Sequence, residues 1–113
     1  MKQETINELV QRLKNSGNYS YIGKNTDYKI PRFDDEIKGH LDVYALKPTE
    51  DHTYLLLFET CADYQKYNVK KAYRNLDNHE LVIGGNADRV FKFIVWPDKI
   101  KWYKQASIQY DKS

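Results

Sequence analysis

Two acidic residues interrupt neighbouring strand-like runs, and they are the residues best placed to do chemistry. Asp42 lies in GHLDVYAL and Glu59 lies in TYLLLFETC. Burial of a carboxylate costs several kcal/mol unless another group compensates its charge. A divalent cation compensates two converging carboxylates at once. The pattern therefore predicts a metal-dependent reaction, and among such reactions it favours phosphodiester hydrolysis.

The two carboxylates would be positioned by a pair of strands. Residues 39–46 alternate, so that residues 41, 43 and 45 share one face and residues 42, 44 and 46 share the other. Residues 47–51 form a turn, and residues 54–59 are a nearly continuous apolar run, as expected of a central strand. The short connection predicts an antiparallel hairpin.

Helices are expected on either side of this hairpin in the chain. Residues 5–15 carry apolar residues at helical spacing, Thr5 and Glu8 could form a capping box, and Gly17 is a natural stop. A second helix is expected near residues 63–76. The apolar positions that define the two helices are Ile6, Leu9, Val10 and Leu13, and then Val69, Ala72, Tyr73 and Leu76.

The remaining segments complete the expected fold. Short strands are predicted at residues 19–22, 81–83 and 100–103, and a stronger strand at residues 90–96. The polar residues 23–38 are interpreted as a loop with at most a short edge strand, and the tail from about residue 105 as loosely held. We expect one α/β domain over residues 1–113, with a mixed sheet flanked by helices in the order α-β-β-β-α-β-β.

Composition narrows the classes of function. The chain has 113 residues and a net charge of only +2, so a nucleic-acid surface would have to be local. One cysteine excludes an intrachain disulfide and a cysteine-based zinc site, and the three histidines lack metal-ligand spacing. No apolar run approaches the length of a membrane span, so we expect an intracellular protein without a membrane partner.

With these elements in place, the chain resembles the PD-(D/E)XK nuclease superfamily, which includes restriction endonucleases and archaeal Holliday-junction resolvases. The resemblance covers roughly residues 4–96: Glu8 on the first helix, Asp42 on one strand, Glu59 on the next, and a following helix. It implies a Mg²⁺ (or Mn²⁺) site made by Asp42, Glu59 and the backbone carbonyl of Cys61, with Glu8 contributing. It also implies endonuclease action on duplex or branched DNA, and a homodimer.

The chain departs from the pattern of that superfamily at one position, because Cys61 stands where the motif has a lysine. Some members place the lysine on the following helix, where Lys66 and Lys70 are candidates here. Four cations of this helix could also contact phosphates, namely Lys66, Lys70, Lys71 and Arg74. Gln65 is followed by Val69 at the spacing where one branch has tyrosine, so that branch is not indicated.

Simpler interpretations stay open for each residue. Asp42 could pair with a lysine, Glu59 could cap the second helix, as Thr60 or Asp63 could, and Glu8 could be half of a capping box. Two other functions are consistent with the sequence. One is a nuclease fold that has lost its chemistry and binds nucleic acid or protein. The other is a structural or interaction protein of viral or mobile-element origin, using its aromatic C-terminal strands as an interface.

Overall fold

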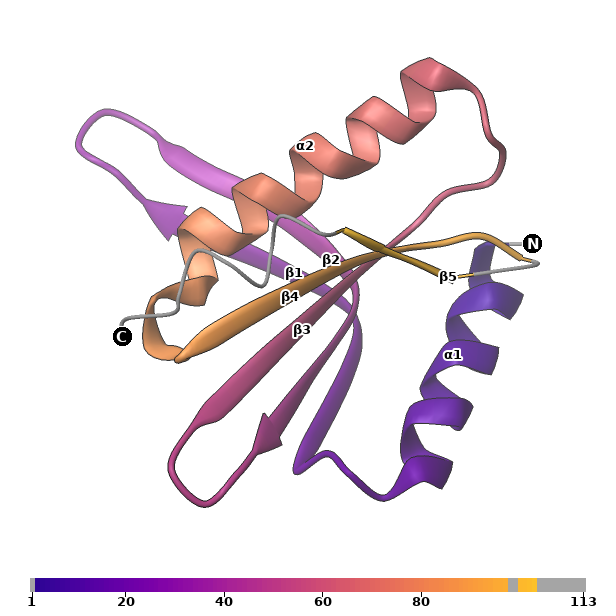
Figure 1. Cartoon of the computed structure of the whole chain (residues 1–113). Coiled ribbons are helices and arrows are strands. Elements are labelled where there is room, and N and C mark those ends of the chain that lie inside the picture. The colour runs from indigo at the N-terminus through magenta and orange to yellow at the C-terminus, as the bar shows by residue number, and fades with distance from the viewer. Residues whose placement is uncertain (1, 98–99, 104–113) are drawn as a thin grey trace.

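Five strands form one mixed sheet, and a helix covers each of its two faces (Figure 1). The computed structural model describes the backbone of residues 2–97 and 100–103, and the side chains of residues 2–85 and 87–97. Its elements are α1 (Lys2–Ser16), β1 (Tyr21–Pro31), β2 (Glu36–Pro48), β3 (Thr53–Thr60), α2 (Lys66–Ile83), the 3₁₀ turn η1 (Gly84–Asn86), β4 (Arg89–Val95) and β5 (Ile100–Tyr103). The predicted element order and mixed sheet are confirmed.

The strands lie in the sheet in the order β1-β2-β3-β4-β5. β1 and β2, β2 and β3, and β4 and β5 are antiparallel pairs, whereas β3 and β4 are parallel. Parallel neighbours need a crossover connection, which α2 provides. The predicted hairpin that joins the strands of Asp42 and Glu59 is therefore correct, and both residues lie near the centre of the sheet.

The first helix is longer than its capping signal indicates. α1 begins at Lys2, so Thr5 and Glu8 lie inside the helix and do not cap it. The Glu8 carboxylate instead pairs with Arg12 one turn later, at 3.3 Å. The predicted stop is correct: Gly17 has a φ of +71°, which glycine adopts without a steric penalty, and its N–H donates to the carbonyl of Lys14.

Each helix covers its own cluster of buried apolar side chains. The cluster under α1 consists of Ile6, Leu9, Val10, Leu13, Val43, Ala45, Leu56, Phe58 and Val95. The cluster under α2 consists of Leu41, Leu55, Leu57, Cys61, Ala72, Leu76, Val90, Ile94 and Trp96. A central strand buried on both faces explains why residues 54–59 form a nearly continuous apolar run.

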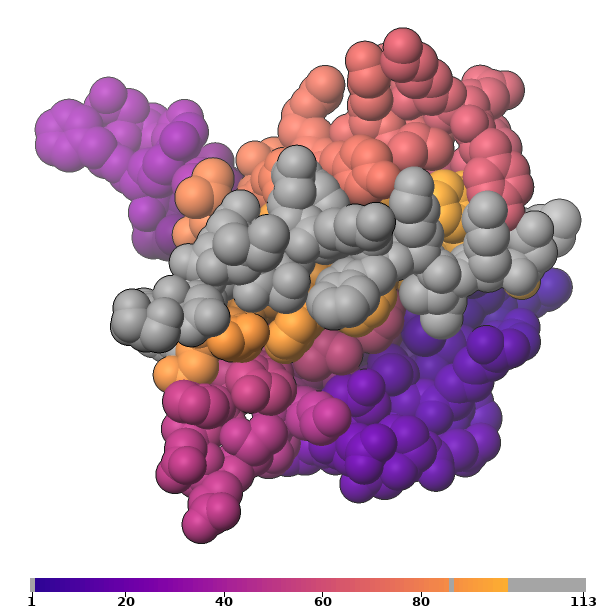
Figure 2. Space-filling model, viewed as in Figure 1, coloured from indigo at the N-terminus to yellow at the C-terminus, as the bar shows by residue number. Residues whose placement is uncertain are grey.

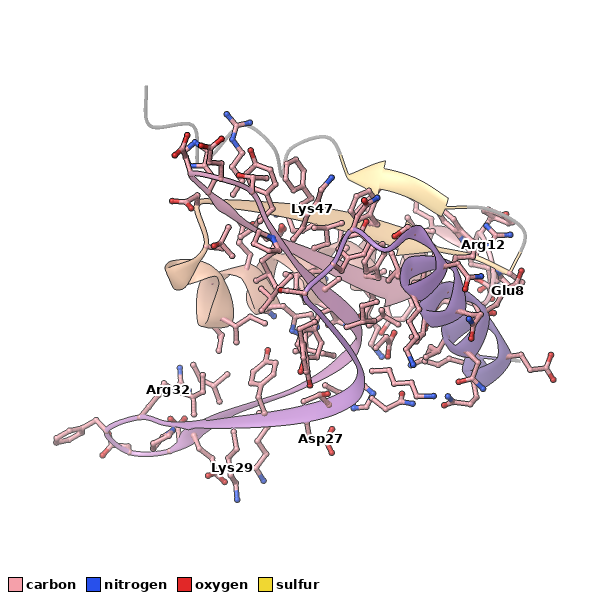
Figure 3. The ribbon with its side chains drawn as sticks, turned by 90° about the horizontal axis from the view of Figure 1, so that it is seen from below. Glu8, Arg12, Asp27, Lys29, Arg32 and Lys47 are labelled. Atoms are coloured by element: carbon pink, nitrogen blue, oxygen red, sulfur yellow. The ribbon has the colours of Figure 1, made fainter. Side chains whose placement is uncertain are left out.

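The polar stretch predicted as a loop is a long β-hairpin. β1 and β2 pair from Tyr21 with Leu46 out to Pro31 with Glu36. We call residues 27–40, the outer part of this hairpin, the arm. It projects from the rest of the molecule in Figures 1 and 3. The interpretation as a loop was wrong because the strands of the arm bury little apolar surface, so the sequence lacks the alternation by which a half-buried strand is recognised.

The β1–β2 ladder is interrupted at the register position of Asn25 and Asp42. Pairing runs through Lys24 with Val43 and resumes at Thr26 with Leu41. Asn25 has a φ of +48°, a conformation that asparagine tolerates better than most residues. The predicted alternation also fails here, because Leu41 packs under α2 whereas Val43 packs under α1. The interruption thus reorients the chain on either side of Asp42.

The second helix extends through the predicted strand at residues 81–83, and that prediction was wrong. α2 begins at Lys66 and runs to Ile83 because its buried face continues past Leu76 through His79 and Glu80. A sequence with polar residues on the buried face does not show a helical apolar stripe. Among the described residues, no helix has the length and apolarity needed to cross a membrane.

The polar part of this helix face holds a buried lysine of the sheet. Lys92, on β4, is 1% exposed. Its ammonium group donates to Asp77 at 2.8 Å and to Glu80, one helical turn apart on α2. Burial lowers the pKa of Lys92, but the hydrogen bonds and charges of Asp77 and Glu80 outweigh it and raise the pKa above its ordinary value. These contacts hold α2 to β4.

Candidate active site

Asp42 is almost fully buried, and its two oxygens have different partners. Oδ2 accepts the backbone N–H of Thr60 at 2.9 Å and the Thr60 hydroxyl at 2.7 Å. Oδ1 lies 3.2 Å from the ammonium group of Lys2. The β2–β3 ladder ends at the pair of Val43 with Phe58, one register step before Asp42 and Glu59. The Asp42 carboxylate therefore takes the place of a backbone carbonyl as the acceptor for the Thr60 N–H. Its other oxygen, Oδ1, points into the site, where it pairs with Lys2.

Glu59 is 8% exposed and is satisfied on one side only. Its Oε2 accepts a hydrogen bond from the side-chain amide of Asn75 on α2, at 2.8 Å. Its Oε1 is buried without a hydrogen-bond partner. Glu59 does not cap α2, whose N-cap residue Gln65 makes no side-chain capping hydrogen bond. The Asp63 carboxylate accepts hydrogen bonds from the Asn68 amide and the Gln65 N–H, which lower its pKa. A buried carboxylate oxygen without a hydrogen bond is costly, so Oε1 is a candidate ligand-binding atom.

Both carboxylates open into one pocket. A hollow of about 240 Å³ is lined by Asp42 and Glu59 together with Lys2, Asn75 and His79, among others. A second hollow of about 320 Å³ shares three lining residues with the first, namely Lys2, Glu59 and Asn75. The structure therefore brings the two sequence-predicted carboxylates together, where the pairing of β2 with β3 ends after Val43 and Phe58.

Lys2 is a cation of this pocket that was not predicted from the sequence. Its ammonium group pairs with Asp42, although the side chain is 60% exposed. The capping signal placed the helix start at Thr5, so the segment before it was not expected to reach the sheet. No pattern of spacing marks Lys2; only the longer helix and its packing bring it to Asp42.

Two histidines flank the two carboxylates in a similar way. Nε2 of His40 lies 3.6 Å from Asp42 Oδ1, and Nε2 of His79 lies 3.6 Å from Glu59 Oε1. Each Nδ1 is held by a neighbour on β1: His40 by Asp27 at 2.6 Å, and His79 by the hydroxyl of Tyr28 at 2.8 Å. The Nε2 atoms thus face the carboxylates, and that of His79 is buried without a hydrogen-bond partner.

Tyr28 reaches His79 only because Gly39 lies opposite it in the ladder. The two residues are paired across β1 and β2, and a β-carbon at Gly39 would lie 2.1 Å from Cζ of Tyr28. The ring also packs edge-on against the imidazole of His79. Burial, and then the charge of Glu59, raise the pKa of Tyr28 above its ordinary value. Tyr28 is therefore a neutral hydrogen-bonding group at neutral pH.

The other sequence-predicted residues lie farther out. Lys66, Lys70 and Arg74 are exposed on α2 and do not line either hollow, whereas the exposed Lys71 lines the second one beside Glu59. Figure 3 shows Glu8 on the outside of α1 beside Arg12, and it does not line either hollow.

Cys61 is buried at the end of β3 and lines the second hollow. Its thiol donates to the carbonyl of Asp63 at 3.2 Å, which is consistent with an inert structural role.

The donor set fits a hard divalent cation through two carboxylates. In the described part of the chain, no three histidine, cysteine, aspartate or glutamate side chains form a preformed metal cluster. Mg²⁺ usually binds through one or two carboxylates and keeps several waters. The two oxygens that could bind such an ion are Asp42 Oδ1, once Lys2 moves away from it, and Glu59 Oε1, which has no hydrogen-bond partner and lies 3.6 Å from Nε2 of His79.

Comparisons with known proteins do not identify a family. No protein-family model and no curated protein matches the chain. A solved structure, the crystal structure of SSO0001, aligns over 86% of this chain with 16% sequence identity and a TM-score of 0.48. The chain spans 48% of the length of that protein. Likeness at this level carries no argument about family or activity.

Proposed function

We propose that the chain is a metal-dependent nuclease of the PD-(D/E)XK type, whose site is the pocket shared by Asp42 and Glu59. One observation carries this proposal: two buried carboxylates from neighbouring strands line one pocket, and an oxygen of Glu59 has no hydrogen-bond partner there. A Mg²⁺ or Mn²⁺ ion held by Asp42 and Glu59 would supply Lewis-acid chemistry to a phosphodiester. The resemblance adds the backbone carbonyl of Cys61 as a further ligand.

In this proposal the residues of the chain orient the substrate and balance its charge. Lys2 would move from Asp42 to an oxygen of the scissile phosphate, so that its charge counters the negative charge that builds up there. Lys71 borders the adjoining hollow and would contact a neighbouring phosphate. Asn75 keeps Glu59 in position through Oε2, which leaves Oε1 directed to the site.

The proposed substrate is DNA, duplex or branched, and this part of the proposal derives from the resemblance. A homodimer is proposed because a cut through both strands of a duplex needs two sites. The aromatic C-terminal strands were expected to form the dimer interface. Two of their aromatic residues contribute little exposed surface to it, because Trp96 is buried and Phe91 packs against the core under α1. The side chains of Trp102 and Tyr103 lie outside the described residues.

The test is cleavage of linear, single-stranded and branched DNA with Mg²⁺ or Mn²⁺, with EDTA as a control. Asp42→Asn and Glu59→Gln keep the shape of each side chain and remove its charge, so both should abolish cleavage. Asp51→Asn, in the exposed turn between β2 and β3, is the matched control and should cleave normally. Binding of Mn²⁺, measured by calorimetry, should be lost in the same two variants. Metal binding and cleavage that survive both substitutions would contradict the proposal.

A second candidate is a nuclease fold that binds nucleic acid without cutting it. The ion pair between Lys2 and Asp42 favours it, because the lysine occupies the oxygen that a metal ion would need. This function predicts DNA binding that is insensitive to EDTA and no stabilisation of the fold by Mn²⁺. Metal-dependent cleavage would exclude it.

A further inference from the structure

The tip of the arm presents an aromatic side chain on a fixed turn. Phe33 is 100% exposed. The guanidinium group of Arg32 donates two hydrogen bonds to the carboxylate of Asp35, each of 2.8 Å, and the Arg32 N–H donates to the Asp35 carbonyl at 2.7 Å. A bidentate contact of this kind fixes geometry as well as distance. The turn therefore holds Phe33 away from the protein.

The arm is long enough to reach well beyond the pocket. β1 and β2 remain paired from Thr26 with Leu41 out to Pro31 with Glu36. At about 3.4 Å a residue, these five steps span about 17 Å. The space-filling view shows the arm as a separate projection, and Figure 3 shows Arg32 near its tip (Figures 2 and 3).

The base of the arm is also a wall of the pocket. Lys38, Gly39 and His40 line the same hollow as Asp42 and Glu59. The hydrogen bond of Tyr28 to His79 ties the same part of the arm to α2. A molecule that occupies the pocket and extends along the arm would therefore meet Phe33 at a defined distance.

The charges of the arm point to bases and not to phosphates as the partner of its tip. Each cation of the arm lies close to a carboxylate of the arm: Arg32 pairs with Asp35, and Lys29 and Lys38 each lie 3.5 Å from Glu36. Binding along a phosphate backbone depends on cations that displace counterions. The arm has three cations and four carboxylates, so its net charge is −1 and no positive charge is in excess. A hairpin of this kind with an aromatic tip instead suits stacking on an unpaired base, which needs only a π-face.

We infer that the arm is a wedge for opened or branched nucleic acid, in which Phe33 stacks on an unpaired base while the backbone lies in the pocket. This inference rests on the proposed nuclease function, because it takes the pocket as the place of the scissile phosphate. An arm of about 17 Å spans about five nucleotide steps of 3.4 Å. The stacked base should thus lie about five nucleotides from the cleaved bond.

Binding without cleavage tests this inference. Affinity for branched and for fully paired DNA would be measured in EDTA, with 2-aminopurine placed at successive positions from the branch. Phe33→Ala should weaken binding of branched DNA about tenfold, since stacking of one base on an aromatic ring has about this effect. It should leave duplex binding nearly unchanged. Phe33→Trp should restore affinity and quench 2-aminopurine at one position. Leu81→Ala, a comparably exposed apolar residue on α2, is the matched control.

The outcomes separate this inference from the proposed function. Branched-DNA binding that is equal in Phe33→Ala and the parent protein overturns the wedge, even if metal-dependent cleavage is observed. Loss of self-association in Phe33→Ala, seen by light scattering with DNA affinity unchanged, also overturns it and makes the tip a contact between copies of the chain. Binding that depends on Phe33 without any cleavage supports the wedge and contradicts the nuclease.

Discussion

Thr60 donates both its backbone N–H and its hydroxyl to the same oxygen of Asp42, at 2.9 and 2.7 Å. This double contact replaces the ladder hydrogen bond that would follow the pair of Val43 with Phe58. It anchors a buried carboxylate to the neighbouring strand and directs its other oxygen towards Lys2. The pocket therefore begins where the Asp42 side chain, in place of a backbone carbonyl, accepts the hydrogen bond from the next strand.

Replacement of Thr60 by valine tests this anchor. Thr60→Val keeps the shape and the N–H but removes a hydrogen bond to a charged group, so we expect a loss of about 2 kcal/mol in the free energy of unfolding. Thr26→Val is the control, because its hydroxyl contacts only the exposed carbonyl of Lys24, and it should change stability by less than about 0.5 kcal/mol. Urea denaturation measures both. Equal stabilities of the two variants would contradict the role of Thr60.

Removal of the charge of Lys2 should have opposite effects on cleavage and on metal binding. Lys2→Met frees Asp42 Oδ1, so affinity for Mn²⁺ should rise, whereas cleavage should fall about 100-fold because phosphate charge is no longer countered. Lys2→Arg should keep part of the activity. Lys14→Met, at the other end of α1, is the control. Calorimetry and single-turnover cleavage give the two readouts, and unchanged cleavage by Lys2→Met would remove Lys2 from the mechanism.

Any side chain at Gly39 should destabilise the protein, because it would clash with the ring of Tyr28. Gly39→Ala places a β-carbon 2.1 Å from the Tyr28 ring, and we expect a loss of about 2 kcal/mol or more in stability. In a Tyr28→Ala background the same substitution should be far milder, which a double-mutant cycle measures as a coupling energy. Gly85→Ala is the control, since no atom lies within 4 Å of the added carbon. Additive effects at Gly39 and Tyr28 would show that the clash is relieved elsewhere.

The buried lysine of β4 should make stability depend on alkaline pH. The pKa of Lys92 is raised in the folded protein above its ordinary value of 10.5. Its contribution to stability is therefore complete below that value and is lost as the pH rises through the higher folded pKa. Unfolding measured from about pH 10 upwards should show a decline that is smaller in Lys92→Met, where the titrating group is absent.

The same variant should also be less stable at neutral pH. Lys92→Met leaves the buried carboxylate of Glu80 without its cation, and removal of one partner of a buried ion pair costs about 3 kcal/mol. Lys29→Met, which removes an exposed ion pair with Glu36, should change stability by less than about 1 kcal/mol. If both variants lost the same stability, the contact of Lys92 with α2 would be unimportant.

The elements that bury apolar residues could be predicted from the sequence, and the polar ones could not. α1, β3 and β4 each present a regular apolar pattern, and all three were expected close to their observed positions. The arm was missed because β1 and β2 bury little beyond the interruption at Asn25. The end of α2 was missed because His79 and Glu80 occupy its buried face, where the sequence pattern requires apolar residues.

The carboxylates of the site could be predicted, whereas their partners could not. Asp42 and Glu59 stand out because each is a charge in an apolar strand. Lys2, Tyr28 and His79 come from three other elements, and only the packing of α1, the arm and α2 brings them to the pocket. Lys66 and Lys70 do not line either hollow. Their predicted catalytic role is not tested by the structure and stays a prediction.

The polar face of α2 determines which changes in chain length the protein can accept. This face meets groups on three strands of the sheet: Asn75 binds Glu59 on β3, His79 binds Tyr28 on β1, and Asp77 and Glu80 both bind Lys92 on β4. All of these contacts depend on one rotational orientation of the helix. Deletion of one residue before Asn75 would turn this face by about 100°. Homologues should therefore vary in length in the loop before α2 and not within the helix.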